Sequence, residues 1–407
     1  MIMLHKFNIV DLFSGCGGFG LGAKQAGFDV IVAVDIDPVL QSSYKQNFPN
    51  TRVLSGDLSL MDKKSWRMAL AGEKIDGVIG GPPCQGYSRI GKNDADDPRR
   101  SLLGHFFRTV NIIQPKFFVM ENVEGLLDEG NKEELEKAIK TVDGRYKVLS
   151  PIIVDAHEYG APTKRKRVVV IGYDPKEMGK ISINDIIPSG LPKVNVKDAI
   201  SDISAPIKQE KDKGNYGWSG YRNAKPLSDY AKKMRQLPPD MLGWSVAIEK
   251  LKSGQTSGHF DTAHTKEVKA RYAATKPGDT DKVSRSKKLE WHGVCPTLRA
   301  GTGADKGSYQ AVRPLHPDEA RVITVREAAR LQGFPDWFCF HKTKWHSFRM
   351  IGNSVSPIVA QSILTLIKSK LHKRSEAKQA SNLSNKLKGD ARDVKAKNKD
   401  NQSRVRC

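Results

Sequence analysis

Short runs of apolar residues alternate with amphipathic stretches along the first 175 residues of the chain. Five runs rich in Val, Ile and Phe predict buried β-strands, at residues 7–12, 28–35, 75–81, 116–122 and 166–173. Helical stretches lie between them: Asp37 followed by Pro38 is a typical helix start, and residues 100–113 carry a helical apolar stripe. This alternation predicts a doubly wound α/β fold.

The pattern changes after residue 182. From there to residue 299, Gly, Pro, Ser, Trp and Lys interrupt the apolar runs, which predicts a separate, irregular and basic region. Regular patterns return at residues 324–338, and residues 356–371 form a strong helix pattern. Residues 371–407 hold 11 Lys and Arg against 4 Asp and Glu and have little hydrophobicity, which predicts a disordered basic tail.

A G-x-G-x-x-G pattern, formed by Gly15, Gly17 and Gly20, follows the first predicted strand, and Asp35 ends the second one. This arrangement is typical of dinucleotide-binding folds, in which the carboxylate holds a ribose diol. Tight strand-to-helix turns need glycine whatever they bind, so the pattern alone does not decide the ligand. An NAD-dependent oxidoreductase therefore stays open at this point.

Three further groups of candidate residues lie at strand ends. Cys84 follows a predicted strand and two prolines, a loop position where open α/β sheets bind ligands, although a cysteine packed in a turn fits equally well. Glu121 leaves another strand as either a catalytic acid or a helix cap. Arg165 and Arg167 project to one face of a third strand. They could bind a carbonyl or phosphate group there, or they could simply form a charged edge exposed to solvent.

Length, net charge and cysteine content limit the classes of function that the chain can have. The 407 residues, 38% of them apolar, predict one or two globular domains. A net charge of +22, from 67 basic and 45 acidic side chains, favours a polyanionic partner over solubility alone. The five cysteines form no C-x-x-C pair, so we expect neither a disulfide framework nor a metal site. The chain has no run of about 18 apolar residues and no signal-like start, which predicts a cytoplasmic protein without a membrane partner.

In order and content the motifs resemble those of the DNA cytosine-5 methyltransferase family, of the bacterial restriction-modification type. The matches are DLFSGCGGFGLG, VDIDP, GD at 56–57, PPCQGYS, ENV, TKRKRV, VREAARLQGFP and IGNSVSP. PPCQ followed by ENV is specific to the family, whereas the glycine loop is not. The resemblance implies a Rossmann-like methyltransferase sheet with helices on both faces, plus a smaller irregular target-recognition domain.

The resemblance also implies the domain organisation. Residues 1–183 form the catalytic and cofactor-binding domain, and residues 184–342 form the target-recognition domain, with a variable part at 184–299 and a bracing segment at 324–335. Arg326, Glu327 and Arg330 of that segment are expected to be structural ion pairs. Residues 343–370 return to the catalytic domain, and 371–407 are the tail.

By the same resemblance, Cys84 is the nucleophile that attacks carbon 6 of cytosine. Glu121 is the acid that contacts cytosine N3 and the exocyclic amino group, while Arg167, and with it Arg165, holds the base O2. The family usually has glutamine where this chain has Thr163, which leaves the local geometry of that strand open.

The implied cofactor is S-adenosylmethionine, with Cys16 as a wall of its pocket. The residues expected to bind it are Phe13, Gly15, Cys16, Gly18, Asp35, Ile36, Asp57, Leu58, Pro83, Leu102, Asn353 and Val355.

The implied substrate is a specific sequence of double-stranded DNA, from which the target cytosine is flipped beneath a mobile loop at residues 85–101. We expect a monomer, with a cognate restriction endonuclease that acts on the same site without binding the methyltransferase. An RNA cytosine-5 methyltransferase and a catalytically inactive DNA-binding relative remain as alternatives; the long basic region argues against the first, and retention of Cys84, Glu121 and Arg167 against the second.

Overall fold

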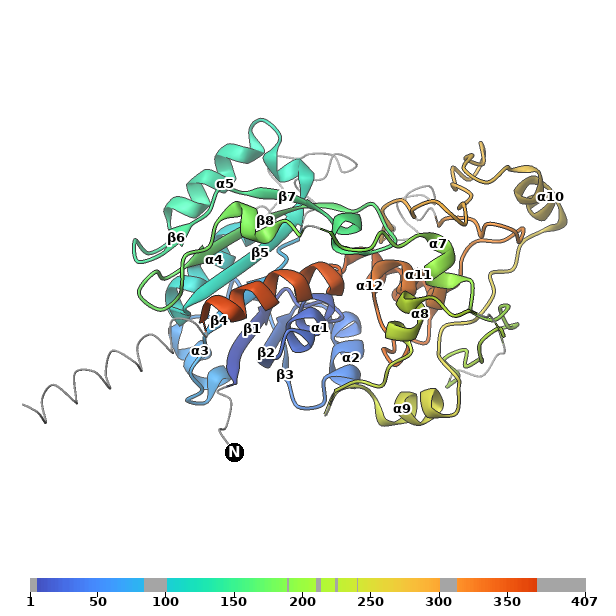
Figure 1. Cartoon of the computed structure of the whole chain (residues 1–407). Coiled ribbons are helices and arrows are strands. Elements are labelled where there is room, and N and C mark those ends of the chain that lie inside the picture. The colour runs from blue at the N-terminus through green and yellow to red at the C-terminus, as the bar shows by residue number, and fades with distance from the viewer. Residues whose placement is uncertain are drawn as a thin grey trace, which may run out of the picture.

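The computed structural model describes residues 6–83, 101–188, 190–209, 214–223, 226–239, 241–300 and 313–371. Two lobes lie side by side in Figure 1. The larger lobe is built around a β-sheet, and the smaller one is formed mainly by the chain between β8 (Lys166–Tyr173) and α11 (Val325–Gln332). The predictions for Cys84, for residues 85–100 and for the tail beyond residue 371 lie outside the described residues.

The sheet has the strand order β3-β2-β1-β4-β5-β8-β6 within the described chain, and β7 pairs with β8 as well. Its first five strands run parallel, whereas β8 runs antiparallel to β5. The other strands are β1 (Phe7–Leu12), β2 (Phe28–Asp35), β3 (Arg52–Ser55), β4 (Gly77–Gly80), β5 (Phe117–Val123), β6 (Lys147–Val148) and β7 (Ile152–Asp155). All five predicted strands are confirmed; β3, β6 and β7 were not predicted.

Helices cover both faces of the sheet, as the alternating pattern predicts (Figure 1). One face packs against α1 (Gly18–Gln25) and the helix at residues 357–371, which contribute Phe19, Ile363 and Ile367 to the core. The other face packs against α3 (Lys63–Leu70), α4 (Ser101–Ile113) and α5 (Asn131–Lys140). Two 3₁₀ turns, η2 (Glu124–Leu127) and η3 (Ala156–Tyr159), follow β5 and β7.

A third apolar core joins the two lobes, where α2 (Pro38–Asn47), α11 and α12 (Lys344–Asn353) meet. The predicted start of α2 is confirmed, because the Asp37 side chain accepts hydrogen bonds from the amides of Val39 and Leu40. The span Lys344–Leu371 is apolar and long enough to cross a membrane, but 67% of its most apolar window is buried inside the protein, as in a core helix.

The smaller lobe is mostly irregular but holds several short helices that the sequence pattern did not predict. These are α7 (Val196–Ile200), α8 (Asp229–Met234), α9 (Ser245–Lys252) and α10 (Lys266–Ala274). Another short helix, α6 (Ile183–Ile186), packs on the larger lobe, where Ile186 joins the core of the sheet. The regular pattern predicted over residues 324–338 holds only for its first half. Helix α11 ends because Gly333 adopts a left-handed conformation with φ 97°, and the aromatic residues after it pack as a buried loop.

Candidate active site

The glycines of the β1–α1 loop and of the first turn of α1 serve different purposes. Gly15 has φ 54°, and a Cβ placed on it would meet nothing within 4 Å, so the loop is open there to a ligand. In contrast, a Cβ on Gly18 would lie 2.4 Å from the Val355 carbonyl oxygen, and one on Gly20 would lie 2.3 Å from the Tyr44 hydroxyl. Two glycines of this stretch are therefore required by packing within the protein.

Asp35, at the end of β2, ties three loops together. Its carboxylate accepts hydrogen bonds from the amides of Gly15 (2.8 Å) and Asp37 (2.9 Å), and its own carbonyl accepts one from the amide of Gly56. Burial raises the pKa of Asp35 above its usual value, although the two amides oppose that shift. The carboxylate is thus fixed at the edge of the sheet where the first, second and third strands end.

Several of the predicted cofactor residues directly follow strands that end at this edge. Ile36 is 68% exposed beside Asp35, which is unusual for an isoleucine. Leu58 is buried behind Asp57, whose pKa is lowered by hydrogen bonds from Ser59. The remaining predicted residues come from the β1 loop, the end of β4, the start of α4 and the segment after α12: Phe13, Pro83, Leu102, Asn353 and Val355.

Cys16 is buried, and its Sγ lies 3.1 Å from the Ser354 hydroxyl. Burial raises the pKa of its thiol to about 12, so the thiol is protonated at neutral pH. Cys295 and Cys339 are buried as well, and burial also raises their pKa values. None of these three cysteines has the environment of a reactive thiolate.

Glu121 and Arg167 form an ion pair between neighbouring antiparallel strands. The Glu121 carboxylate, at the end of β5, lies 3.0 Å from Nε of Arg167 at the start of β8. Both side chains are largely buried, at 12% and 16% exposure, so the pair keeps some access to solvent. A carboxylate and a guanidinium held together in this way can recognise donor and acceptor groups on one planar ligand.

The loop that leads into Cys84 lies directly beside Glu121. A Cβ on Gly81 would lie 3.5 Å from Glu121 Oε2, and the Pro82 carbonyl accepts a hydrogen bond of 3.3 Å from the Asn122 side chain. Asn122 is buried. The end of β5 therefore both supplies the carboxylate and fixes the approach to the predicted nucleophile.

Arg165, the second predicted arginine, is engaged by backbone carbonyls. Its guanidinium is buried and donates hydrogen bonds to the carbonyls of Leu298 (3.2 Å), Gly352 (3.0 Å) and Ser354 (2.9 Å). These bonds join the start of β8 to the end of the smaller lobe and to the segment after α12, so they favour a positioning role over contact with a base. Thr163 adds to this junction, because its hydroxyl donates to the Cys295 carbonyl.

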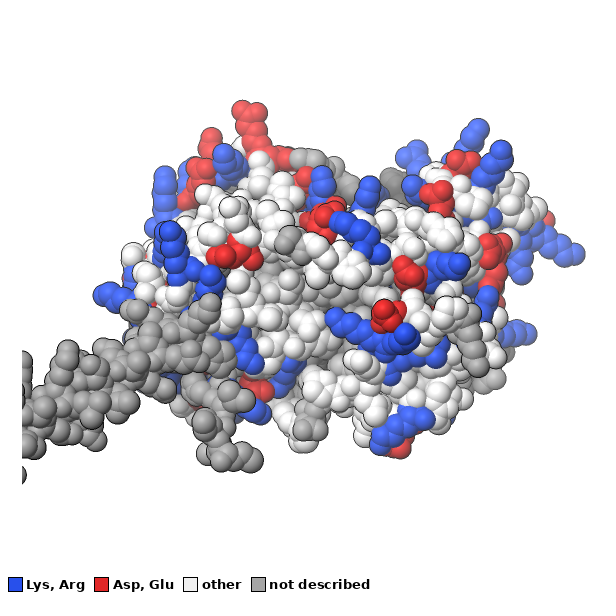
Figure 2. Space-filling model, in the orientation of Figure 1, with Lys and Arg blue, Asp and Glu red and all other residues white. Residues whose placement is uncertain are grey.

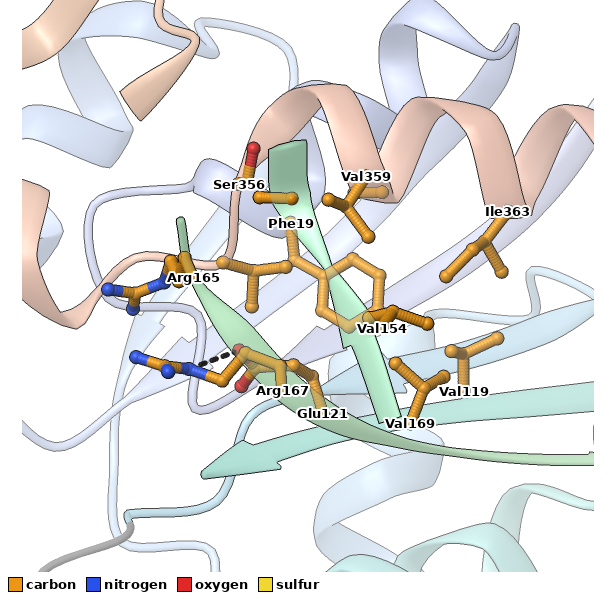
Figure 3. Close-up of a pocket in the computed structure, with 13 residues that line it drawn as sticks. Phe19, Val119, Glu121, Val154, Arg165, Arg167, Val169, Ser356, Val359 and Ile363 are labelled. Atoms are coloured by element: carbon orange, nitrogen blue, oxygen red, sulfur yellow. Dashed lines mark ion pairs between the residues drawn. The ribbon is translucent and has the colours of Figure 1, made fainter. Parts of the chain in front are cut away.

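A pocket opens between the Glu121–Arg167 pair and the helix at residues 357–371 (Figure 3). Glu121, Arg165 and Arg167 lie at one end of it, and Val119, Val169 and Ile363 line its apolar interior. Val355, one of the predicted cofactor residues, also lines this pocket, so the pocket joins the ion pair to the segment predicted to hold the cofactor.

Comparison with known proteins decides the family. The model of C-5 cytosine-specific DNA methylases matches residues 7–369. The chain belongs to this family. It is similar to the type II methyltransferase M.XorII of Xanthomonas oryzae pv. oryzae, with 41% identity over 377 residues that cover 90% of this chain and 86% of the relative.

Solved structures agree. A crystal structure from E. coli, assigned as a prophage-encoded DNA modification methyltransferase, matches with a TM-score of 0.80 and 42% identity over 90% of this chain and 100% of that one. The S. pombe Dnmt2 methyltransferase shares only 16% identity, at a TM-score of 0.58, and supports the fold alone; the match covers 90% of this chain and 100% of that one. The protein is a DNA (cytosine-5-)-methyltransferase, and the oxidoreductase interpretation of its glycine loop is wrong.

In this methyltransferase, the segment around α11 braces the smaller lobe through buried ion pairs. Arg330 pairs with Asp336 (2.6 Å) and with Asp202 (3.2 Å), and none of these side chains is more than 1% exposed. Glu327 pairs with Arg321 at 2.9 Å. Arg326 donates to three backbone carbonyls of residues 257, 335 and 338. These contacts stabilise the smaller lobe from within.

Sequence reasoning missed two residues that shape the methyltransferase site. Asn122 positions Pro82, and its place within the ENV motif was the available signal. Arg349 of α12 pairs with Asp37 at 2.6 Å, and no local pattern in the sequence indicates that contact.

Proposed function

We propose that the enzyme transfers a methyl group from S-adenosylmethionine to carbon 5 of a cytosine within a specific double-stranded DNA sequence, through a transient bond between Cys84 and carbon 6. The observation that carries this proposal is the Glu121–Arg167 pair, 3.0 Å apart, beside the Gly81–Pro83 loop that ends at Cys84.

Carbon 5 of cytosine is a poor nucleophile until carbon 6 has been attacked. The Cys84 thiolate adds to carbon 6, and the electron pair of the 5,6 double bond makes carbon 5 nucleophilic. The bound cofactor would supply the methyl group to carbon 5 and leave as the thioether S-adenosylhomocysteine. A base then removes the carbon 5 proton, and the electron pair of that C–H bond re-forms the 5,6 double bond and expels the thiolate. The product is 5-methylcytosine, and the enzyme regains its thiolate.

Glu121 and Arg167 act on the base itself. As negative charge develops in the ring during thiolate addition, the Glu121 carboxyl group contacts N3 and the exocyclic amino group, and the Arg167 guanidinium holds O2. The ion pair prevents either side chain from rotating out of this geometry. Arg165 supports Arg167 from behind by fixing the start of β8 to the carbonyls of Leu298 and Ser354.

The residues at the edge of the sheet fit S-adenosylmethionine. Gly15 leaves room for close backbone approach, the Asp35 carboxylate suits the ribose diol, and exposed Ile36 offers an apolar face to adenine. Asp57 would accept a hydrogen bond from the adenine amino group, and the other residues that would line the pocket are Phe13, Cys16, Gly18, Leu58, Pro83, Leu102, Asn353 and Val355. The cofactor supplies an electrophilic methyl group on a sulfonium.

The DNA must deliver its cytosine outside the stacked helix, because the stacked neighbours cover the ring faces that are attacked. We propose that residues 184–342 form the target-recognition domain that holds the duplex. Figure 2 shows Lys and Arg side chains around α10 in the smaller lobe. Exposed basic residues on α10 and the chain after it include Lys266, Lys269, Lys276, Lys282, Arg285 and Lys287, which suit phosphate contacts.

The similarity to type II methyltransferases supports a proposal for the cellular role of the enzyme. We infer that the enzyme is a monomer in the bacterial cytoplasm, associated with the nucleoid, and that it protects host DNA from a cognate endonuclease that recognises the same site.

The test is methyl transfer to DNA by purified Cys84→Ser and Glu121→Gln variants, with Cys407→Ser as the matched control. Cys84→Ser should abolish transfer while cofactor binding persists, and Glu121→Gln should reduce transfer by about 10²-fold or more. Bisulfite sequencing of the expressing host's DNA then identifies the target. Transfer that survives in Cys84→Ser would exclude the covalent mechanism.

A further inference from the structure

Helix α12 reaches across to the loop that holds the predicted ribose carboxylate. Its Arg349 guanidinium lies 2.6 Å from Asp37 Oδ2, with both side chains mostly buried. Arg349 also lies over the Trp345 ring, one turn earlier in the same helix, which restricts its orientation. Because α12 packs against α2, the ion pair joins two elements that are more than 300 residues apart in the chain.

Asp37 is the link between this ion pair and the cofactor edge. Its Oδ1 caps α2, its Oδ2 binds Arg349, and its amide donates to Asp35 Oδ1. The other Asp35 oxygen accepts from the amide of Gly15. A series of direct contacts therefore runs from Arg349 through Asp37 and Asp35 to the open glycine loop.

We propose that Arg349 is a positioning residue for the cofactor, which holds the Asp35 carboxylate in place through Asp37 and so strengthens binding of the adenosine group. The inference rests on the proposed role of Asp35 at the ribose. Arg349 itself need not touch the cofactor, because its guanidinium is already engaged by Asp37.

Charge supports the need for such a residue. Asp35 and Asp37 are two residues apart, and the Asp37 charge raises the pKa of Asp35 in addition to the larger effect of burial. Arg349 opposes that shift. Burial would also raise the pKa of Asp37, but the hydrogen bond and charge of Arg349, together with the amides of Leu40 and Val39, hold the Asp37 pKa below its usual value. Without Arg349, the two carboxylates would repel each other with no nearby compensation from α12.

The same helix also contacts the smaller lobe. A Cβ on Gly352 would lie 2.3 Å from the Ala300 amide nitrogen, and the Gly352 carbonyl accepts a hydrogen bond from Arg165. Helix α12 thus lies between the cofactor edge and the chain that follows the recognition region. Arg349 is the charged contact by which this helix acts on the cofactor loop.

The experiment measures binding of S-adenosylhomocysteine to the full chain by calorimetry, together with kcat and KM for methyl transfer. Arg349→Met should raise Kd by about fivefold, the upper range for a partly exposed ion pair. Arg349→Lys should recover most of the affinity, and kcat at saturating cofactor should change by less than about twofold. Asp37→Asn combined with Arg349→Met should bind no more weakly than the weaker single variant.

Lys24→Met is the matched control. It removes a 2.8 Å ion pair between Lys24 of α1 and Asp29, which lies on the same strand as Asp35 (β2) but at the end away from the cofactor edge. Its Kd should equal that of the wild type. If Asp35→Asn weakens binding but Arg349→Met does not, or if Lys24→Met weakens binding equally, the positioning role is wrong. If Asp35→Asn leaves Kd unchanged, the proposed ribose site itself fails.

Discussion

Replacing Gly22 by alanine should loosen the contact between α1 and the helix at residues 357–371. A Cβ at Gly22 would lie 2.4 Å from the Ala360 Cβ, 2.6 Å from the Pro357 carbonyl oxygen and 2.7 Å from the Gln361 amide nitrogen. Ordinary contacts between such atoms are about 3.5–4.0 Å, so the two helices must separate by roughly 1 Å. Overpacking of this kind costs about 1–3 kcal/mol of stability. The cost at Gly22 should lie near the upper limit, because two of the three atoms in the way are backbone atoms that cannot move aside independently.

Gly104 provides the matched control for this substitution. It also lies within a helix, α4, but a Cβ there would meet nothing within 4 Å. Both substitutions gain about 1 kcal/mol of helix propensity, so the difference between them isolates the packing cost, about 3 kcal/mol.

Urea unfolding of the two alanine variants measures this difference directly. Gly104→Ala should be more stable than the wild type and Gly22→Ala about 2 kcal/mol less stable. Equal stability of the two variants would refute the close docking of the C-terminal helix on α1.

Three further predictions follow from buried and exposed charges. Arg330→Met should lower the free energy of unfolding by about 3–5 kcal/mol, because it deprives Asp336 and Asp202 of a shared buried counter-ion; a loss below about 1 kcal/mol would contradict this. Iodoacetamide at pH 8 should leave Cys16 unmodified in the folded protein, since its thiol has a pKa of about 12 and is fully protonated there; mass spectrometry checks this. Replacing Lys282 and Arg285 together by glutamine should reduce the slope of log binding constant against log salt for DNA by about 2, and an unchanged slope would exclude phosphate contacts by this turn.

Local sequence signals were sufficient for the central part of the fold. The predicted strands are apolar and mostly buried on both faces, and the Asp37–Pro38 start of α2 is confirmed by its cap. The strands β6 and β7 could not be predicted from apolar runs. Strand β6 has only two residues, β7 alternates buried and exposed positions over four, and within the described chain both pair only with β8. The short helices of the smaller lobe are likewise stabilised by tertiary packing more than by their own sequences.

In the candidate site, too, residues that follow local patterns could be predicted and contacts between distant segments could not. The acidic residues and arginines at strand ends could be predicted because the topology of an open α/β sheet collects these ends at one edge. Contacts between distant segments could not. The Arg165 guanidinium is directed by carbonyls at Leu298 and Gly352, more than 130 residues away, and Arg349 meets Asp37 only after the chain returns to the first strand.

The central claim is that Cys84 bonds to carbon 6 of the target cytosine, and trapping tests it most directly. Duplex DNA that carries 5-fluorocytosine at the methylated position blocks the final proton loss, because fluorine replaces the hydrogen at carbon 5. Incubation with enzyme and S-adenosylmethionine should therefore give a denaturant-resistant complex, with the nucleotide found by mass spectrometry on the peptide that contains Cys84. The absence of any such complex on DNA that is otherwise methylated, or its attachment to another residue, would contradict the account.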